Sequence, residues 1–125
     1  MEIMKNKPSS ESVPPKSLLG YWKITEMDLW DAAYIDLVVP GHITFERDGL
    51  GEFQFGTVHG WIDCRFGSTP EGPEVQFSWE GESDTDPGCG RGWARLRDGK
   101  LVGRIFIHLA DVSGFVAQKP SKVGA

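Results

Sequence analysis

Apolar and polar residues alternate strictly over three stretches in the middle of the chain. Gln54 lies between two phenylalanines in the first stretch, and the second and third cover residues 61–66 and 75–80. A period of two puts alternate side chains on opposite faces of a β-strand, so each stretch predicts a strand with one buried face. Residues 51–81 therefore predict three strands joined by turns, and they determine which face of the sheet lies inside.

The pairing of the second and third strands follows from the same alternation. Residues that face each other across antiparallel strands lie on the same side of the sheet. Pairing Phe66 with Val75 brings apolar side chains together along both strands, whereas a shift by one residue would set Phe77 opposite Asp63. We therefore predict the first register, with the connection over residues 67–74.

Shorter patterns predict the remaining elements. One short helix is expected after the first strand, with Asp28 as its N-cap, an apolar stripe that includes Trp30 and Leu37, and an end before Pro40. A helix this short needs a surface to pack on, and we expect it to cover the open end of the sheet. Residues 80–87 predict an acidic loop. Strands are predicted over residues 18–25, 41–46, 52–55, 58–66, 75–80, 89–97, 101–108 and 113–118.

Turn residues predict two further pairings. Asp98–Gly99 is typical of a two-residue hairpin turn, which pairs Arg97 with Lys100. The inner face of that hairpin is rich in glycine, and we expect these glycines to leave space for large neighbours such as Trp79. In the earlier hairpin we expect Phe45 to face Phe53, through a connection of odd length with a glycine in the left-handed region.

Eight strands joined mostly by short hairpins predict an all-β fold. The arrangement that removes exposed strand edges is an eight-stranded antiparallel up-and-down barrel, here with one short helix after the first strand. The length of 125 residues fits one domain. We expect a disordered N-terminal arm over residues 1–16, a single barrel domain over 17–119 and a C-terminal tail over 120–125.

Composition narrows the function classes. A net charge of −5 argues against a nucleic-acid binder, because attraction to phosphate dominates that kind of affinity. No stretch approaches the roughly 20 apolar residues of a membrane span, and the N-terminus lacks a signal-peptide pattern, so we expect a cytoplasmic protein without a membrane partner. Cys64 and Cys89 form no Cys-x-x-Cys motif, and two free thiols are the expectation.

Two sets of residues in this chain resemble those of known protein families. Gly20-Tyr21-Trp22 followed by a short helix resembles the Gly-x-Trp opening of lipocalins and other calycins, whose barrels commonly hold apolar ligands. That pattern also includes an arginine near the last strand, where this chain has Lys119. Segments such as 51–56 and 90–94 look like a family of small bacterial proteins of uncharacterised function. The resemblances imply a calycin-like barrel in a bacterial cytoplasm and supply no catalytic residues.

The first candidate site is the interior of the barrel. Small-molecule sites are apolar concavities with a few polar groups, and the mouth of a β-barrel is a common place for one. Alternatively the side chains themselves fill the interior, because an eight-stranded barrel is narrow enough for solid packing. A small apolar ligand in the interior would contact Trp22, Trp30, Phe45, Phe55, Phe77 and Trp79.

The second candidate site is the outer face of the sheet, where arginines and aromatic residues interleave. Arginine over an aromatic ring can hold an anion or a partner surface. This face would then bind another protein or a second copy in a homodimer, whereas cation–π pairs within the sheet are the alternative explanation. The residues concerned are Trp61, Arg91, Trp93, Arg95, Arg104 and Phe106.

Signals for catalysis and metal binding are weak. His59, Asp63, Glu80 and Arg91 are the only plausible set for a small hydrolase or isomerase, and His59 and Asp63 lie about 13 Å apart along one strand. The acidic residues 80–86 lack the spacing of a calcium loop. We therefore predict a non-enzymatic binding module with no metal or cofactor, holding an apolar ligand in the barrel. The alternative is protein interaction or self-assembly through the outer face.

Overall fold

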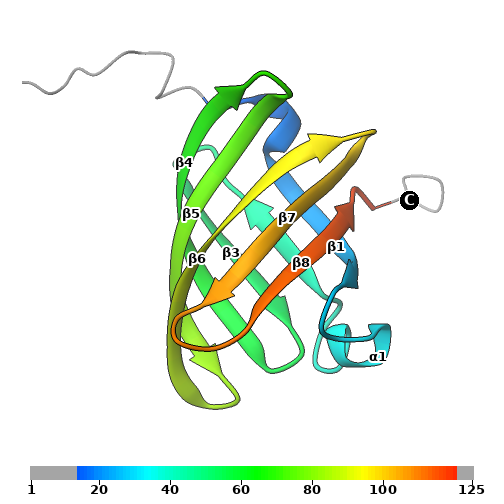
Figure 1. The fold of residues 1–125 in the computed structure, drawn as a ribbon, viewed down its shortest axis with the longest axis vertical. Helices are drawn as coiled ribbons and strands as arrows, with labels where there is room; N and C mark the ends of the chain where they lie inside the picture. Colours follow the sequence, from blue (N-terminus) through cyan, green and yellow to red (C-terminus); the bar gives the residue numbers. More distant parts are fainter. Residues whose placement is uncertain (1–13, 121–125) are drawn as a thin grey trace, which may run out of the picture.

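Eight strands close into a barrel in chain order in the computed structural model, which describes residues 14–120 (Figure 1). Strand β1 pairs with both β2 and β8, so the sheet has no free edge. The predicted eight-stranded antiparallel barrel is confirmed. Residues 1–13 of the predicted arm and 121–125 of the predicted tail lie outside the described residues. The elements are a 3₁₀ turn (Lys16–Leu18), β1 (Gly20–Met27), α1 (Ala32–Ile35), β2 (His42–Phe45), β3 (Leu50–Phe55), β4 (Val58–Thr69), β5 (Gly72–Ser83), β6 (Asp86–Arg97), β7 (Lys100–Ile107) and β8 (Val112–Gln118).

Two predicted registers are confirmed in full. Phe66 faces Val75 between β4 and β5, and the pairing continues to the ends of both strands. Across the turn at Asp98 and Gly99, Arg97 faces Lys100 on β7. The outward and inward faces of β4 to β7 therefore lie as the alternation predicted.

The predicted register between β2 and β3 is wrong by two residues. Phe45 faces Gly51, and Phe53 faces Ile43. The connection is tighter than expected, because the Glu46 amide donates to the Leu50 carbonyl at 2.7 Å. A side chain at position 51 would collide with the backbone carbonyl of Thr44, so only glycine fits at this place in the pair. A shift by two keeps every side chain on its predicted face.

The helix is shorter than predicted, and its N-cap is a different residue. Asp31 caps α1 by accepting a hydrogen bond from the Tyr34 amide at 3.0 Å. Asp28, the predicted cap, accepts instead from the Gly114 amide on β8. Leu37, expected on the buried stripe, is exposed. The segment still lies at one end of the barrel, where the Trp30 ring packs at 4.9 Å from that of Phe55 (Figure 1).

The predicted acidic loop is a hairpin. Strand β5 continues to Ser83 and β6 begins at Asp86, so that only Asp84 and Thr85 form the turn. Both turn residues have positive φ, 54° and 75°, as two-residue hairpin turns of this type require. The acidic side chains therefore lie on two paired strands and their turn.

Aromatic rings from several strands meet inside the barrel. The Phe53 ring lies 5.0 Å from that of Trp79, and the Phe45 ring lies 6.2 Å from that of Phe77. Glycines make room for them, since a side chain at Gly92 would collide with the Phe77 ring. Phe45 and Phe53 expose no surface to a water-sized probe, so no water-sized void lies beside them.

The first and last strands are joined at the opposite end of the barrel. The Trp22 indole donates to the Leu18 carbonyl at 3.0 Å, and Lys119 Nζ lies 4.5 Å above the Trp22 ring. The same ammonium donates to the Leu19 carbonyl at 2.6 Å. Lys119 thus links the end of β8 to the start of β1. No helix within residues 14–120 is long and apolar enough to cross a membrane.

Candidate functional site

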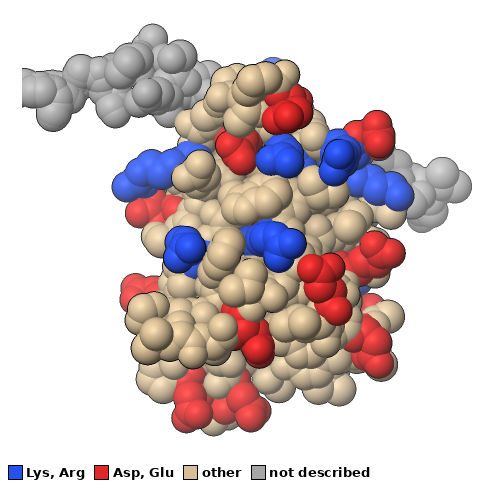
Figure 2. Space-filling model, in the orientation of Figure 1, with Lys and Arg blue, Asp and Glu red and all other residues tan. Residues whose placement is uncertain are grey.

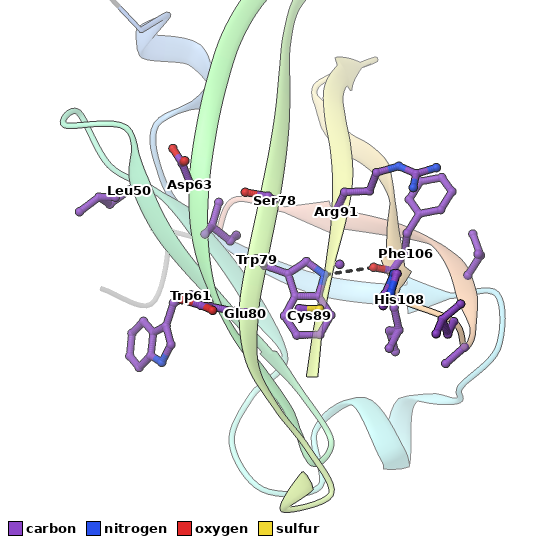
Figure 3. A pocket seen from close by; sticks show the side chains of 16 residues that line it. Leu50, Trp61, Asp63, Ser78, Trp79, Glu80, Cys89, Arg91, Phe106 and His108 are labelled. Carbon is purple, nitrogen blue, oxygen red and sulfur yellow. Dashed lines mark hydrogen bonds between the residues drawn. The ribbon is translucent and has the colours of Figure 1, made fainter. Parts of the chain in front are cut away.

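A pocket of about 830 Å³ lies on the outer face of the barrel, over β4 to β7 (Figure 3). One row of paired residues crosses it, from Asp63 through Ser78 and Arg91 to Phe106. Ser78 and its neighbour Cys89 are small, whereas large side chains stand on either side of them. The hollow therefore results from small residues on the central strands β5 and β6 between bulky residues on the flanking strands.

The two walls of the pocket are apolar and exposed to solvent. Trp61 on β4 is 59% exposed and Leu50 on β3 is 55% exposed, and across the floor Val112 is 41% and Leu109 is 93% exposed. These are four of the eight large apolar side chains that are exposed among the described residues. Such a concentration of exposed apolar surface is typical of an interaction site.

Leu109 is also in a strained conformation. It lies in the turn between β7 and β8 with φ of 60°, a region that glycine or asparagine adopts far more readily than leucine. The turn is held on both sides of it, because the Ala110 amide donates to the Ile107 carbonyl at 2.9 Å and the Ile107 amide donates to the Asp111 carbonyl at 2.9 Å. An apolar side chain is thus presented to solvent at an energetic cost to the fold.

Charge divides the pocket into two halves. Asp63 and Glu80 lie on β4 and β5, and Arg91 and His108 lie at the side of β6 and β7. The Arg91 guanidinium lies 4.4 Å from the centre of the Phe106 ring, and it takes part in none of the ion pairs within residues 14–120. The ring holds the guanidinium in place while its N–H groups stay available for an anion.

Trp61 is positioned by a cluster that the sequence analysis missed. Glu52 Oε1 lies 2.9 Å from His42 Nε2, and Glu52 Oε2 lies 2.8 Å from His59 Nε2. The His59 ring in turn packs 4.7 Å from that of Trp61. The wrong register between β2 and β3 concealed this cluster, because it set Glu52 opposite Glu46 and away from His42.

The two cysteines are free and differ in their surroundings. Cys89 is exposed on the floor of the pocket, whereas Cys64 is buried on the inner face of β4. Burial raises the pKa of the Cys64 thiol to about 12, with a smaller contribution from the negative charge of Asp63. Of the two thiols, Cys89 is therefore the one that reagents in solvent can reach.

The predicted surface residues fall into two groups. Trp61, Arg91 and Phe106 line the pocket described above. Trp93, Arg95 and Arg104 line a second hollow of about 490 Å³ over β6 to β8, in which the Arg95 guanidinium stacks 4.7 Å from the Trp93 ring. Figure 2 shows Lys and Arg over the middle and upper part of this face, with Asp and Glu at both ends and along the sides. The structure therefore separates one predicted surface into two sites.

The remaining candidates are the residues of the barrel interior and the predicted catalytic and metal-binding residues. The predicted interior residues, apart from Trp30 at the barrel end, belong to the packed core, with at most 4% of their surface exposed. A ligand inside would have to displace these rings, and the interior site stays a prediction. Asp63, Glu80 and Arg91 line the outer pocket, but His59 is hydrogen-bonded to Glu52 and does not. Within residues 14–120 no three His, Cys, Asp or Glu side chains are grouped to hold a metal ion.

Comparison with known protein families, with curated proteins and with solved structures finds no match for this chain.

Proposed function

We propose that this protein is a non-enzymatic binding module whose binding site is the outer pocket between Trp61 and Phe106. The observation that carries the proposal is the meeting of exposed apolar walls with an arginine that has no carboxylate partner within residues 14–120, in one hollow of about 830 Å³. In the isolated barrel the apolar walls are exposed to water, which is unfavourable, and the Arg91 guanidinium packs on the Phe106 ring. A complementary group that enters the pocket would cover the walls and bind the guanidinium.

The pocket favours a ligand group that combines an aromatic or apolar body with a carboxylate. The Trp61 ring provides a large flat surface for stacking. Across the floor, the fork of the Arg91 guanidinium matches the two oxygens of a carboxylate. Arg91 lies two strands from Trp61, at about 4.8 Å a strand, and two residues further along, at about 3.4 Å a residue, so the Cα atoms of these anchors are about 12 Å apart. A protein side-chain pair, or a small aromatic acid, spans that separation.

The barrel interior is the second candidate, for an apolar ligand. The Gly-x-Trp opening on β1 and the ammonium of Lys119 above Trp22 support the resemblance to calycins. The tightly packed rings of Phe45 and Phe53 favour the outer pocket over the interior.

Titration followed by NMR with indole-3-acetate, an aromatic ring bearing a carboxylate, separates the two sites. We expect amide shifts at Cys89 and Phe106 and a shift of the Trp61 indole N–H, with those at Phe45 and Phe53 unchanged. Indole-3-ethanol, which lacks the carboxylate, is the matched ligand and should bind more weakly. Arg91→Gln should remove the difference between the two ligands. Shifts confined to interior residues, or none at the pocket, would contradict the proposal.

A further inference from the structure

We propose that a second copy of this chain occupies the pocket, and that the two copies are related by a twofold axis that runs along the strands between Ser78 and Cys89. This inference rests on the proposed function, because it names the partner of the same site. Such a contact is isologous, so one surface has to be complementary to itself. The pocket has that property in charge and in apolar surface.

Charge is the first argument for self-complementarity. Acidic residues Asp63 and Glu80 lie on one side of the proposed axis, and Arg91 lies on the other side. A twofold axis in the plane of the contact exchanges the two sides, so the acidic half of each copy meets the basic half of the other. The carboxylate of Asp63, which Arg65 of the same copy contacts at 3.0 Å, is then placed to reach the guanidinium of Arg91 in the second copy as well, and the contact occurs twice. Complementary charge of this kind sets the orientation of a protein contact.

Apolar surface is the second argument, since the same operation exchanges the two walls. The Trp61 ring of one copy is brought over Phe106, Val112 and Leu109 of the other. A protruding aromatic side chain thus meets an aliphatic and aromatic wall across a floor of small residues. Buried Trp and Arg side chains near the centre are the residues that most often dominate the energy of a protein contact.

Leu109 is both strained and exposed, which also favours a contact with a second copy. Its φ of 60° lies in the left-handed region, which is unfavourable for leucine, and 93% of its surface faces solvent. The side chain is therefore almost unburied by the rest of residues 14–120, and its contribution to folding is a net cost. Backbone strain of this type is retained where the side chain is needed elsewhere. Because Leu109 lies on the wall of the pocket, its side chain can contact Trp61 of the second copy.

The size of the pocket fits the contact. A standard interface takes about 20–30 residues from each partner. The pocket alone is lined by 16 residues, and every strand from β4 to β7 contributes at least one outward-facing side chain to it. The outward residues at its rim supply the remainder.

The test uses two charge reversals in the full chain, Asp63→Arg and Arg91→Glu. Each variant alone places like charges opposite each other twice in the dimer, and we expect each to weaken dimerisation by at least about 30-fold. An equimolar mixture restores an attractive pair at both contacts, so heterodimers should form where neither variant dimerises alone. Sedimentation velocity measures the dimer fraction, and native mass spectrometry separates the heterodimer by mass. Arg104→Glu makes the same charge change outside the pocket and should leave the dimer intact.

Two results would refute the dimer, and the second requires that the variants stay folded. Both reversed residues are exposed, so the folded state is expected to persist and is checked by circular dichroism. A wild-type chain that stays monomeric up to about 1 mM would refute self-association, since weaker affinities lie outside the range of a specific dimer. A dimer that survives both reversals would place the contact elsewhere and refute it as well. In either case the indole-3-acetate titration at Trp61 decides separately whether the pocket is a binding site.

Discussion

Replacement of Gly92 by alanine tests how tightly the interior of the barrel is packed. A methyl group at this position would lie 2.6 Å from the Arg104 carbonyl on β7 and would also collide with the Phe77 ring. Ordinary contacts of this kind are about 3.5 Å, so β6 and β7 would have to separate by roughly 1 Å. The carbonyl belongs to the paired backbone and cannot rotate away. Overpacking of this extent costs about 1–3 kcal/mol.

The matched control is Gly67→Ala on β4, where nothing lies within 4 Å of the added methyl group. Alanine at such a place stabilises by about 0.4–1 kcal/mol, because it restricts the unfolded chain. We therefore expect the two variants to differ by about 2–3 kcal/mol in the free energy of unfolding, measured by urea denaturation. For a domain of this size the difference corresponds to roughly 10 °C in the midpoint of thermal unfolding. A difference below about 0.5 kcal/mol would show that the interior yields easily, and would revive a ligand site inside the barrel.

Three further predictions concern Leu109 and the cysteines. Leu109→Gly should raise the free energy of unfolding of the monomer by about 0.5–1 kcal/mol, because glycine has no penalty at positive φ. Leu37→Gly, at an exposed leucine with ordinary φ, should lower it, and two changes of the same sign in urea denaturation would contradict the strain at Leu109. Iodoacetamide at pH 8 should modify Cys89 alone in the folded protein, and a second adduct by mass spectrometry would show that Cys64 is not protected. Because folding raises the pKa of the Cys64 thiol from 9.0 to about 12, its protonated form contributes stability that is complete below pH 9 and is lost as the pH rises toward 12. Cys64→Ala should therefore flatten the decline of the free energy of unfolding over this range, and an unchanged slope would argue against that pKa.

The strand pairings could be predicted wherever apolar and polar residues alternate clearly on both strands, or where a turn motif fixes the length of the connection. On β4 and β5 a shift by one residue would have buried a charge, and the Asp98–Gly99 turn fixed β6 against β7. Alternation has a period of two, however, and it does not distinguish registers that differ by two. Phe45 was therefore set opposite Phe53 instead of Gly51. The deciding factor was the collision that any side chain at position 51 would make with Thr44, which is a property of the assembled sheet.

The residues of the outer pocket were only partly predictable. Alternation placed Trp61, Arg91 and Phe106 on the outer face, and the structure confirms that orientation. The hollow itself depends on the small residues between them on β5 and β6, and its far wall depends on the conformation of one turn. Leu109 carries no sequence signal for its positive φ, since leucine rarely adopts it. These residues could therefore be recognised as one pocket only from the three-dimensional arrangement of four strands.

The pairing of β1 with β8 constrains the order of events during synthesis. Its partners, such as Ile24 and Ala117, are separated by most of the chain, so the seam closes a very long loop. On the ribosome, β1 leaves the exit tunnel before β8 and keeps one edge unpaired until β8 follows. During that interval the unpaired edge is open to strand-mediated association, and the Lys119 ammonium can reach the Leu19 carbonyl only once β8 is in place.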